Sequence, residues 1–143
     1  MLPSKIQSAL SYCEGKNVYE IMEDNNIELL SIPLESAYGV ILINDDKSII
    51  IIDKALPWQC KEFVLWHEIG HFLLDHKNGE FHFLKNSKGE RDVNVFACLM
   101  LGGNMQEWTY RGVPIEIAVN VYDYLSQNVY VKELLSDVYF LKR

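Results

Sequence analysis

The first 56 residues change from a helical to an extended pattern of apolar positions. Between Lys5 and Asn25 apolar residues recur every three or four positions, with Gly15 interrupting, so one or two short helices are expected. Three runs rich in Ile, Leu and Val follow, IELLSIPL, YGVILIN and SIIIID, and each is typical of a β-strand. The polar residues 44–47 between the last two runs predict a hairpin turn. This part of the chain therefore predicts an N-terminal helix and a small three-stranded antiparallel sheet.

The pattern after Pro57 is helical. Pro57 stands where the first turn of a helix tolerates proline, and the helix that follows is predicted to continue to about Asp75. After a polar loop, a second helix should run from about Glu90 to the glycine pair in LMLGGN. A third helix is predicted over PIEIAVNVYDYL and a fourth over VYVKELLSDVYFL. A sheet followed by helices indicates an α+β fold.

Length and composition predict a single domain. The chain has 143 residues, of which 49% are hydrophobic, enough for one core. We expect one domain over residues 1–143, made of an N-terminal helix and sheet (1–56), two helices that carry most candidate site residues (57–103) and C-terminal helices (104–143).

Charge and targeting signals exclude some classes of partner. The formal net charge is −7 and no basic tract occurs, which weighs against direct binding of nucleic acid or of an anionic membrane. The start, MLPSKIQSAL, lacks the apolar core of a secretory signal, and no apolar run reaches the ~20 residues needed to span a bilayer. We therefore expect a cytoplasmic protein. Its cysteines, Cys13, Cys60 and Cys98, are odd in number and widely spaced, so reduced thiols are expected.

Two histidines and a glutamate interrupt the apolar helix predicted after Pro57. The stretch VLWHEIGHFLLDH, residues 64–76, places His67 and His71 four residues apart, with Glu68 beside the first. At about 100° per residue, the two histidines share one apolar face and Glu68 lies about a quarter turn away. Side chains four apart on a helix are about 6 Å apart, close enough for two imidazoles to bind one metal ion.

This H-E-x-x-H spacing predicts a catalytic zinc site. Zinc lowers the pKa of bound water from about 15.7 to near 7, and a carboxylate beside it can carry the proton. A buried carboxylate without compensation costs several kcal/mol, which gives Glu68 no structural reason to be there. The alternative is a pair of hydrogen-bonded core histidines; we favour the metal site because both histidines and Glu68 fit one helix.

A catalytic zinc ion usually takes a third protein ligand. His76 points about 140° away from His71 on a continuing helix, and His82 can reach the site only if its loop folds back. Asp92 lies at the edge of the inward face of the helix predicted after residue 90, although acids are also common in a first helical turn. The downstream candidates are His76, Glu80, His82, Glu90 and Asp92.

Two motifs resemble those of the ImmA/IrrE metallopeptidases. HEIGHFLLDH followed by ERDVNVFACLML is similar to the family patterns H-E-x-G-H-x-x-L-x-H and E-x-[ED]-A-[ND]-x-F-A, over roughly residues 60–101. The resemblance implies that His67 and His71 bind zinc, that Glu68 is the general base and acid, and that Asp92 is the third ligand. The family usually has glutamate where Asp92 stands, so Glu90 remains an alternative for this role.

The same resemblance implies a function. It predicts a minimal zincin-like domain and a zinc-dependent endopeptidase whose substrate is a helix-turn-helix repressor of a mobile element or stress response. SIIIID or YGVILIN could supply a sheet edge for an extended substrate. The candidates to polarise the substrate carbonyl are Tyr38, His82, Tyr110 and Arg111. The alternative function is a non-catalytic, zinc-containing protein that regulates a partner by binding.

Tyrosines recur in the two C-terminal helices at helical spacing with Val, Leu and Ile, so we expect core positions for them rather than an interface. They are Tyr122, Tyr124, Tyr130 and Tyr139.

Overall fold

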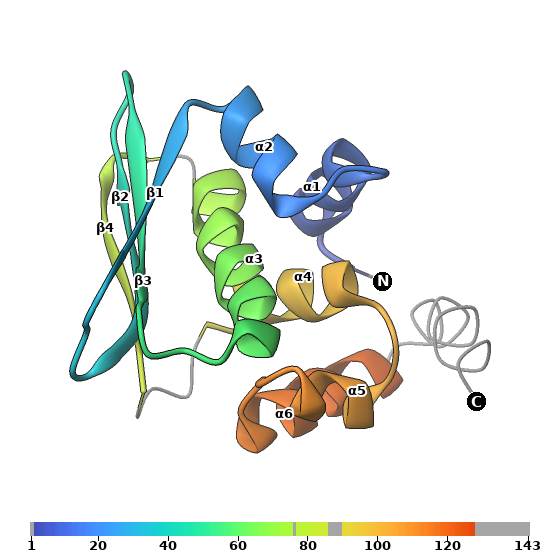
Figure 1. Ribbon diagram of the computed structural model, residues 1–143. Helices are drawn as coiled ribbons and strands as arrows, with labels where there is room; N and C mark the ends of the chain where they lie inside the picture. The colour runs from blue at the N-terminus through green and yellow to red at the C-terminus, as the bar shows by residue number, and fades with distance from the viewer. Residues whose placement is uncertain (1, 76, 86–89, 128–143) are drawn as a thin grey trace.

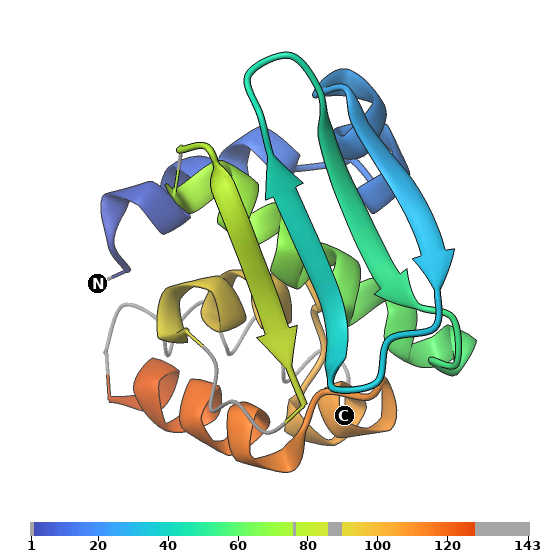
Figure 2. The same ribbon diagram turned by 90° about the vertical axis from the view of Figure 1, so that its left-hand side faces the viewer.

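The fold is a four-stranded sheet with all of the described helices on one of its faces. A computed structural model describes residues 2–75, 77–85 and 90–127. The strands are β1 (Ile27–Ile32), β2 (Ala37–Ile43), β3 (Ser48–Asp53) and β4 (Gly79–Leu84). The helices are α1 (Ser4–Cys13), α2 (Val18–Asp24), α3 (Trp58–Asp75), α4 (Arg91–Leu101), α5 (Met105–Tyr110) and α6 (Ile115–Ser126). Figures 1 and 2 show the helices of this part on the same side of the sheet.

The α+β class is confirmed, but the sheet differs from the predicted one in two ways. The strand order is β1-β3-β2-β4, and β1 pairs parallel with β3 instead of antiparallel. β2 pairs antiparallel with both β3 and β4. The fourth strand forms in a segment that the sequence pattern assigned to a loop. Its six residues, GEFHFL, lack the run of Ile, Leu and Val that marked the other strands, and pairing with β2 decides their conformation.

The strand order also corrects the expected substrate edge. SIIIID and YGVILIN correspond to β3 and β2, and both lie inside the sheet with a partner on each side. The two edges are β1 and β4. An interior strand has no free backbone groups for an incoming peptide, so neither of the two expected strands can accept one.

Helix α3 lies between the sheet and α4 and is buried on almost every side. Every residue from Phe63 to His71 is buried. Close packing against α4 depends on Gly70, because a Cβ atom there would lie 3.0 Å from Val93 Cγ1 and 3.2 Å from Phe96 Cδ2. This close approach brings the start of α4 beside the middle of α3.

The remaining described helices are α1, α2, α5 and α6. Both predicted N-terminal helices are present, and Asn17 and Glu20 form a capping box at the start of α2. Helix α5, which the sequence analysis did not predict, begins where Asn104 caps it. The third helix predicted after Pro57, over PIEIAVNVYDYL, forms α6. Tyr124 packs against the core as predicted, but the core position expected for Tyr122 is wrong, because Tyr122 is 37% exposed. The predicted helix over VYVKELLSDVYFL, with Tyr130 and Tyr139, lies outside the described residues.

Two further expectations can be compared with the described residues. Cys13, Cys60 and Cys98 are free thiols, as predicted. Within the described ranges, the helices are all too short or too polar to cross a membrane.

A buried aspartate joins three chain segments beside the end of β3. Asp53 is 4% exposed, and its Oδ1 accepts hydrogen bonds from the backbone N–H groups of Leu34, at 3.1 Å, and Ala55, at 3.2 Å. Its Oδ2 lies 3.4 Å from Lys85 Nζ, which follows β4. The hydrogen bond from Leu34 is the main influence that lowers the pKa of Asp53, against the opposing effect of burial.

We predict that Asp53→Ala lowers the free energy of unfolding by about 1–3 kcal/mol, because buried N–H groups lose their acceptor. Urea unfolding at pH 7 measures this, with the exposed Asp46→Ala as a control that changes stability by less than about 0.5 kcal/mol. Because the pKa of Asp53 is lower in the folded protein than the value of about 3.9 in an unfolded chain, its ionised form stabilises the fold fully above that pH. The difference between wild type and Asp53→Ala should shrink as the pH falls further, and a constant difference would contradict the assignment.

Candidate metal centre

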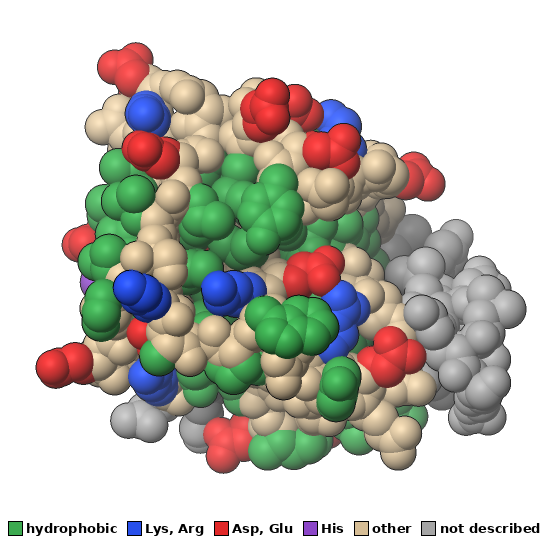
Figure 3. All heavy atoms as spheres, viewed as in Figure 1, with side chains coloured by type: hydrophobic (Ala, Val, Ile, Leu, Met, Phe, Trp, Pro, Cys, Tyr) green, Lys and Arg blue, Asp and Glu red, His purple; other side chains and the backbone are tan. Residues whose placement is uncertain are grey.

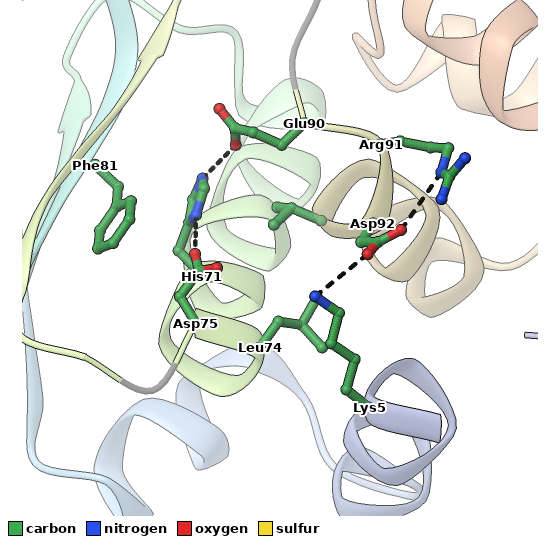
Figure 4. A pocket seen from close by; sticks show the side chains of 9 residues that line it. Lys5, His71, Leu74, Asp75, Phe81, Glu90, Arg91 and Asp92 are labelled. Carbon is green, nitrogen blue, oxygen red and sulfur yellow. Dashed lines mark hydrogen bonds and ion pairs between the residues drawn. The ribbon is translucent and has the colours of Figure 1, made fainter. Parts of the chain in front are cut away.

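Three side chains from two segments converge beside the middle of α3. His67 and His71 come from α3, and Glu90 is the residue that directly precedes α4. One ligand atom from each lies within 4.8 Å of the other two. His71 Nε2 is 2.6 Å from Glu90 Oε2, and His67 Nε2 is 3.7 Å from the same oxygen. Figure 4 shows His71 held between Glu90 and Asp75.

The three groups differ in burial. His67 is fully buried and His71 is 3% exposed, whereas half of the Glu90 side chain is accessible to solvent. The centre is therefore closed to solvent on the side of α3 and open to solvent at Glu90. A hollow of about 440 Å³ adjoins this side, with His71, Glu90 and Phe81 among its lining residues.

Each histidine is fixed through its second ring nitrogen. His67 Nδ1 lies 2.8 Å from Asn94 Oδ1, and His71 Nδ1 lies 2.6 Å from Asp75 Oδ2. An amide or carboxylate oxygen can only accept, so both Nδ1 atoms carry the proton and donate it. The Nε2 atoms of both rings then face Glu90, and in neutral rings these are the atoms that can bind a metal. Asn94 follows Glu90 by one helical turn, so the start of α4 supplies both residues.

Strand β4 covers the faces of both imidazole rings. Phe83 stacks on His67 with ring centroids 3.9 Å apart and planes at 11°, and Phe81 stacks on His71 at 4.8 Å and 20°. The alternation of a strand turns His82 to the opposite face of the sheet, where it lies 3.5 Å from Glu80. The sequence analysis missed Phe81, Phe83 and Asn94. The signal for the phenylalanines was the F-x-F alternation in GEFHFL, and that for Asn94 its place one turn after Glu90.

Burial and charge set the protonation of the three converging groups. Burial, reinforced by the charge of His71, lowers the pKa of His67 to about 3, so the ring is neutral. Burial also disfavours the charged form of His71, but the hydrogen bonds and charges of Glu90 and Asp75 outweigh it and raise the pKa of His71. Burial alone would raise the pKa of Glu90, yet its contact with His71 lowers it overall, so Glu90 is ionised.

Glu68 is the most unusual polar residue of the centre. It follows His67 on α3 and is fully buried, and among the described residues neither carboxylate oxygen has a hydrogen-bond partner. Burial raises the pKa of Glu68 well above its usual value, with a smaller contribution from the charge of Glu90. An unpaired buried carboxyl group is costly, which indicates that function and not stability places it there.

The donor set fits a zinc ion. Two imidazole nitrogens and one carboxylate oxygen are a common ligand set of catalytic zinc, with the remaining position left open. His67 Nε2 supports this fit, because it is buried and has no hydrogen-bond partner among the described residues. A metal ion at this position would satisfy that nitrogen and offset the charge of Glu90.

Asp92 lines the same hollow as His71 and Glu90, but its carboxylate does not converge on the two histidines. Asp92 turns away from the histidines, with its carboxylate 3.3 Å from Lys5 Nζ and 3.5 Å from Arg91 Nε (Figure 4). The reason is that α4 begins at Arg91, so Glu90 keeps an extended backbone and reaches back toward α3. Two residues further along the helix, Asp92 faces another direction. Of the two acids that the sequence left open, the structure brings Glu90 and not Asp92 to the histidines. His76 lies outside the described residues.

The four candidates to polarise a substrate carbonyl are also separated. Tyr38 packs on Phe83 with ring centroids 5.0 Å apart, which places it one side chain away from His67. Tyr110 and Arg111 line a different hollow of about 830 Å³ beside the exposed Trp58, and Arg111 pairs with Glu62. Figure 3 shows one face of the molecule, where apolar side chains lie among charged ones. With His82 on the outer face of β4, Tyr38 is the candidate that contacts a ring covering the histidines.

Known proteins resemble this chain over the same elements. Residues 22–105 match the peptidase M78 family, described as the IrrE N-terminal-like domain, and this range is more than half of the chain. The chain is also 34% identical over 92 residues to Metallopeptidase ImmA of Bacillus subtilis (strain 168). The aligned residues are 62% of this chain and 52% of ImmA, so the chain spans about half the length of this relative.

The geometry predicts different effects of removing the two acids. Glu90→Ala should lose most of its zinc during dialysis at neutral pH, because the histidines alone leave the ion without a carboxylate. Asp92→Ala should keep its zinc, because its carboxylate pairs with Lys5 instead. Metal content per chain, measured by emission spectrometry, checks both. Loss of zinc in Asp92→Ala but not in Glu90→Ala would make Asp92 the ligand.

A second prediction concerns Asn94. Asn94→Ala should lower zinc affinity about 10- to 100-fold, because the orientation of the His67 ring is no longer fixed. Asn94→Asp keeps an acceptor oxygen and should lose less, and Asn120→Ala on the surface of α6 serves as a control. Competition with a zinc-binding dye measures the affinity. Equal losses in Asn94→Ala and Asn94→Asp would show that the contact to His67 Nδ1 does not matter for metal binding.

Proposed function

The chain belongs to the peptidase M78 family of metallopeptidases, and on this basis we propose that it is a zinc-dependent endopeptidase that cleaves a specific protein substrate. One observation carries the proposal. The metal-binding group of His67, His71 and Glu90 lies on the same buried helix segment as Glu68, a carboxyl group with no structural partner among the described residues.

In this proposal the residues of the metal site have different roles. His67, His71 and Glu90 hold the zinc ion. The bound zinc supplies a Lewis acid that polarises the scissile carbonyl and makes water more acidic. Asn94 and Asp75 keep both Nδ1–H groups engaged, so that the Nε2 atoms remain free to bind. Phe81 and Phe83 exclude water from the outer faces of the rings.

Glu68 acts as the general base and then as the general acid. Its carboxylate takes a proton from the attacking water and returns it to the leaving amine. The raised pKa of Glu68 suits this role, because a carboxylate with an ordinary pKa holds a proton too weakly at neutral pH. The absence of a hydrogen-bond donor to either oxygen, among the described residues, leaves both lone pairs available for water.

Strand β4 replaces the interior strands as the proposed edge for the substrate. It pairs with β2 on one side, is an edge of the sheet and carries the two rings that cover the histidines. An extended peptide that adds to this edge would pair its backbone with β4 and pass beside the metal ligands. Side-chain contacts in the adjoining hollow could then select the sequence that is cut.

The proposed substrate is a helix-turn-helix repressor of a mobile element or stress response, in the cytoplasm. The support for this choice is the resemblance of the two motifs to the ImmA/IrrE metallopeptidases and the similarity to ImmA. The net charge of −7 without a basic tract favours contact with a repressor over contact with its DNA. A non-catalytic regulator that binds zinc is the alternative, but binding alone gives no reason for a buried, unpaired Glu68.

The experiment compares wild type with Glu68→Gln on any helix-turn-helix protein that is encoded beside this gene. We expect zinc-dependent cleavage by wild type, detected by mass spectrometry of the fragments. Glu68→Gln should keep its zinc and lose about 10²- to 10⁴-fold in rate, because an amide cannot accept the proton. Glu62→Gln is a matched control on the same helix, since Glu62 contacts Arg111 at the other hollow. Full activity of Glu68→Gln, or zinc-loaded wild type that cuts no co-encoded partner, would contradict the proposal.

A further inference from the structure

Gly39 on β2 lies directly against the carboxylate of Glu68. A Cβ atom at Gly39 would stand 2.9 Å from Glu68 Oε2 and 2.9 Å from Val64 Cγ1. It would also stand 3.3 Å from the backbone oxygen of Ile51 on the neighbouring strand. These separations are shorter than ordinary van der Waals contact. The absence of a side chain at Gly39 therefore leaves a recess on β2, and the carboxylate of Glu68 occupies it.

The backbone of Gly39 does not itself require glycine. Its φ is outside the positive range that L-residues avoid, unlike that of Gly15 or Gly112. A glycine inside a strand costs conformational entropy and removes a packing side chain. Since a positive φ does not explain glycine here, we infer its role from the close approach of Glu68 and Val64.

Steric walls, and not hydrogen bonds, fix the carboxylate of Glu68. Both oxygens are buried and lack a hydrogen-bond partner among the described residues. Two groups border the recess that holds the carboxylate: the backbone of β2 at Gly39, and the side chain of Val64, which lies one turn before Glu68 on α3. A change in these walls would move the carboxylate, because no donor holds it in place.

The pairing of β2 places this recess next to the metal ligands. The register with β4 shifts between Ala37 and Gly39, and Gly39 is paired with Phe83. Phe83 stacks on His67. Paired residues of β2 and β4 thus contact both groups: Gly39 lies against the Glu68 carboxylate, and Phe83 stacks on the adjacent His67.

We propose that Gly39 is a positioning residue for the general base: its missing side chain forms the seat that holds the Glu68 carboxylate at the reaction site. This inference rests on the proposed endopeptidase function. Any larger residue at position 39 would push Glu68 Oε2 out of its seat without touching a metal ligand. Small displacements of a catalytic group cost large factors in rate, up to about 10²-fold for 1 Å.

The first test separates catalysis from metal binding. Gly39→Ala should keep zinc at the wild-type level and wild-type KM for the repressor substrate, while kcat falls at least about tenfold. Val40→Ala is the matched control, because it changes the next residue of β2, whose side chain is on the other face of the sheet. It should keep the wild-type kcat. A wild-type kcat in zinc-loaded Gly39→Ala, or an equal loss in Val40→Ala, would overturn the proposal.

The second test needs no substrate and so distinguishes this inference from the proposed function. Melting temperatures of the zinc-loaded proteins are compared for Gly39→Ala, Glu68→Ala and the double variant. Gly39→Ala should lower the melting temperature clearly less when Glu68 is already alanine, because the clash with the carboxylate is then removed. Equal decreases in both backgrounds would show that Gly39 does not seat Glu68. If wild type cuts no protein but the decreases differ, the seat stands and the endopeptidase function fails.

Discussion

The burial of helix α3 between the sheet and α4 is the constraint on which the centre depends. It removes His67, Glu68 and His71 from water, and each polar group must then find a partner inside the protein or remain unpaired. Asn94 and Asp75 satisfy one nitrogen of each imidazole. The atoms that remain, the Nε2 atoms of both histidines and the Glu68 carboxylate, are those that metal binding and proton transfer would use. The proposed functional groups on α3 are thus polar atoms that the rest of the fold does not hydrogen-bond.

The elements around α3 each contribute a part that α3 cannot supply. The start of α4 provides Glu90, and its close approach is possible because Gly70 has no side chain. Strand β4 covers the imidazole rings with Phe81 and Phe83 and gives the sheet an edge beside the site. Strand β2 provides the recess at Gly39. The matched family range, residues 22–105, includes all of these parts.

Local sequence was sufficient to predict the part of the centre that lies on α3. His67, Glu68 and His71 lie within five residues of one helix, and helical periodicity alone fixes their relative directions. The same periodicity predicted α3, α4 and α6 and an α+β class, because each of these segments repeats its apolar pattern over several turns. Strand β4 lacks the run of Ile, Leu and Val found in the other strands, and α5, with six residues, is too short to repeat an apolar pattern.

Contacts between segments far apart in the sequence decided the other features of the centre and of the sheet. Glu90 and Asp92 are two residues apart with similar chemistry, and only the start of α4 at Arg91 and its approach to α3 determine which one reaches the histidines. The parallel pairing of β1 with β3 and the place of β4 depend on how strands choose partners across the sheet. The sequence by itself determined which residues can perform the chemistry on α3. The tertiary structure decided which acid lies beside the histidines, which aromatic rings cover them and which glycine lies against Glu68. Those features depend on packing between segments far apart in the chain.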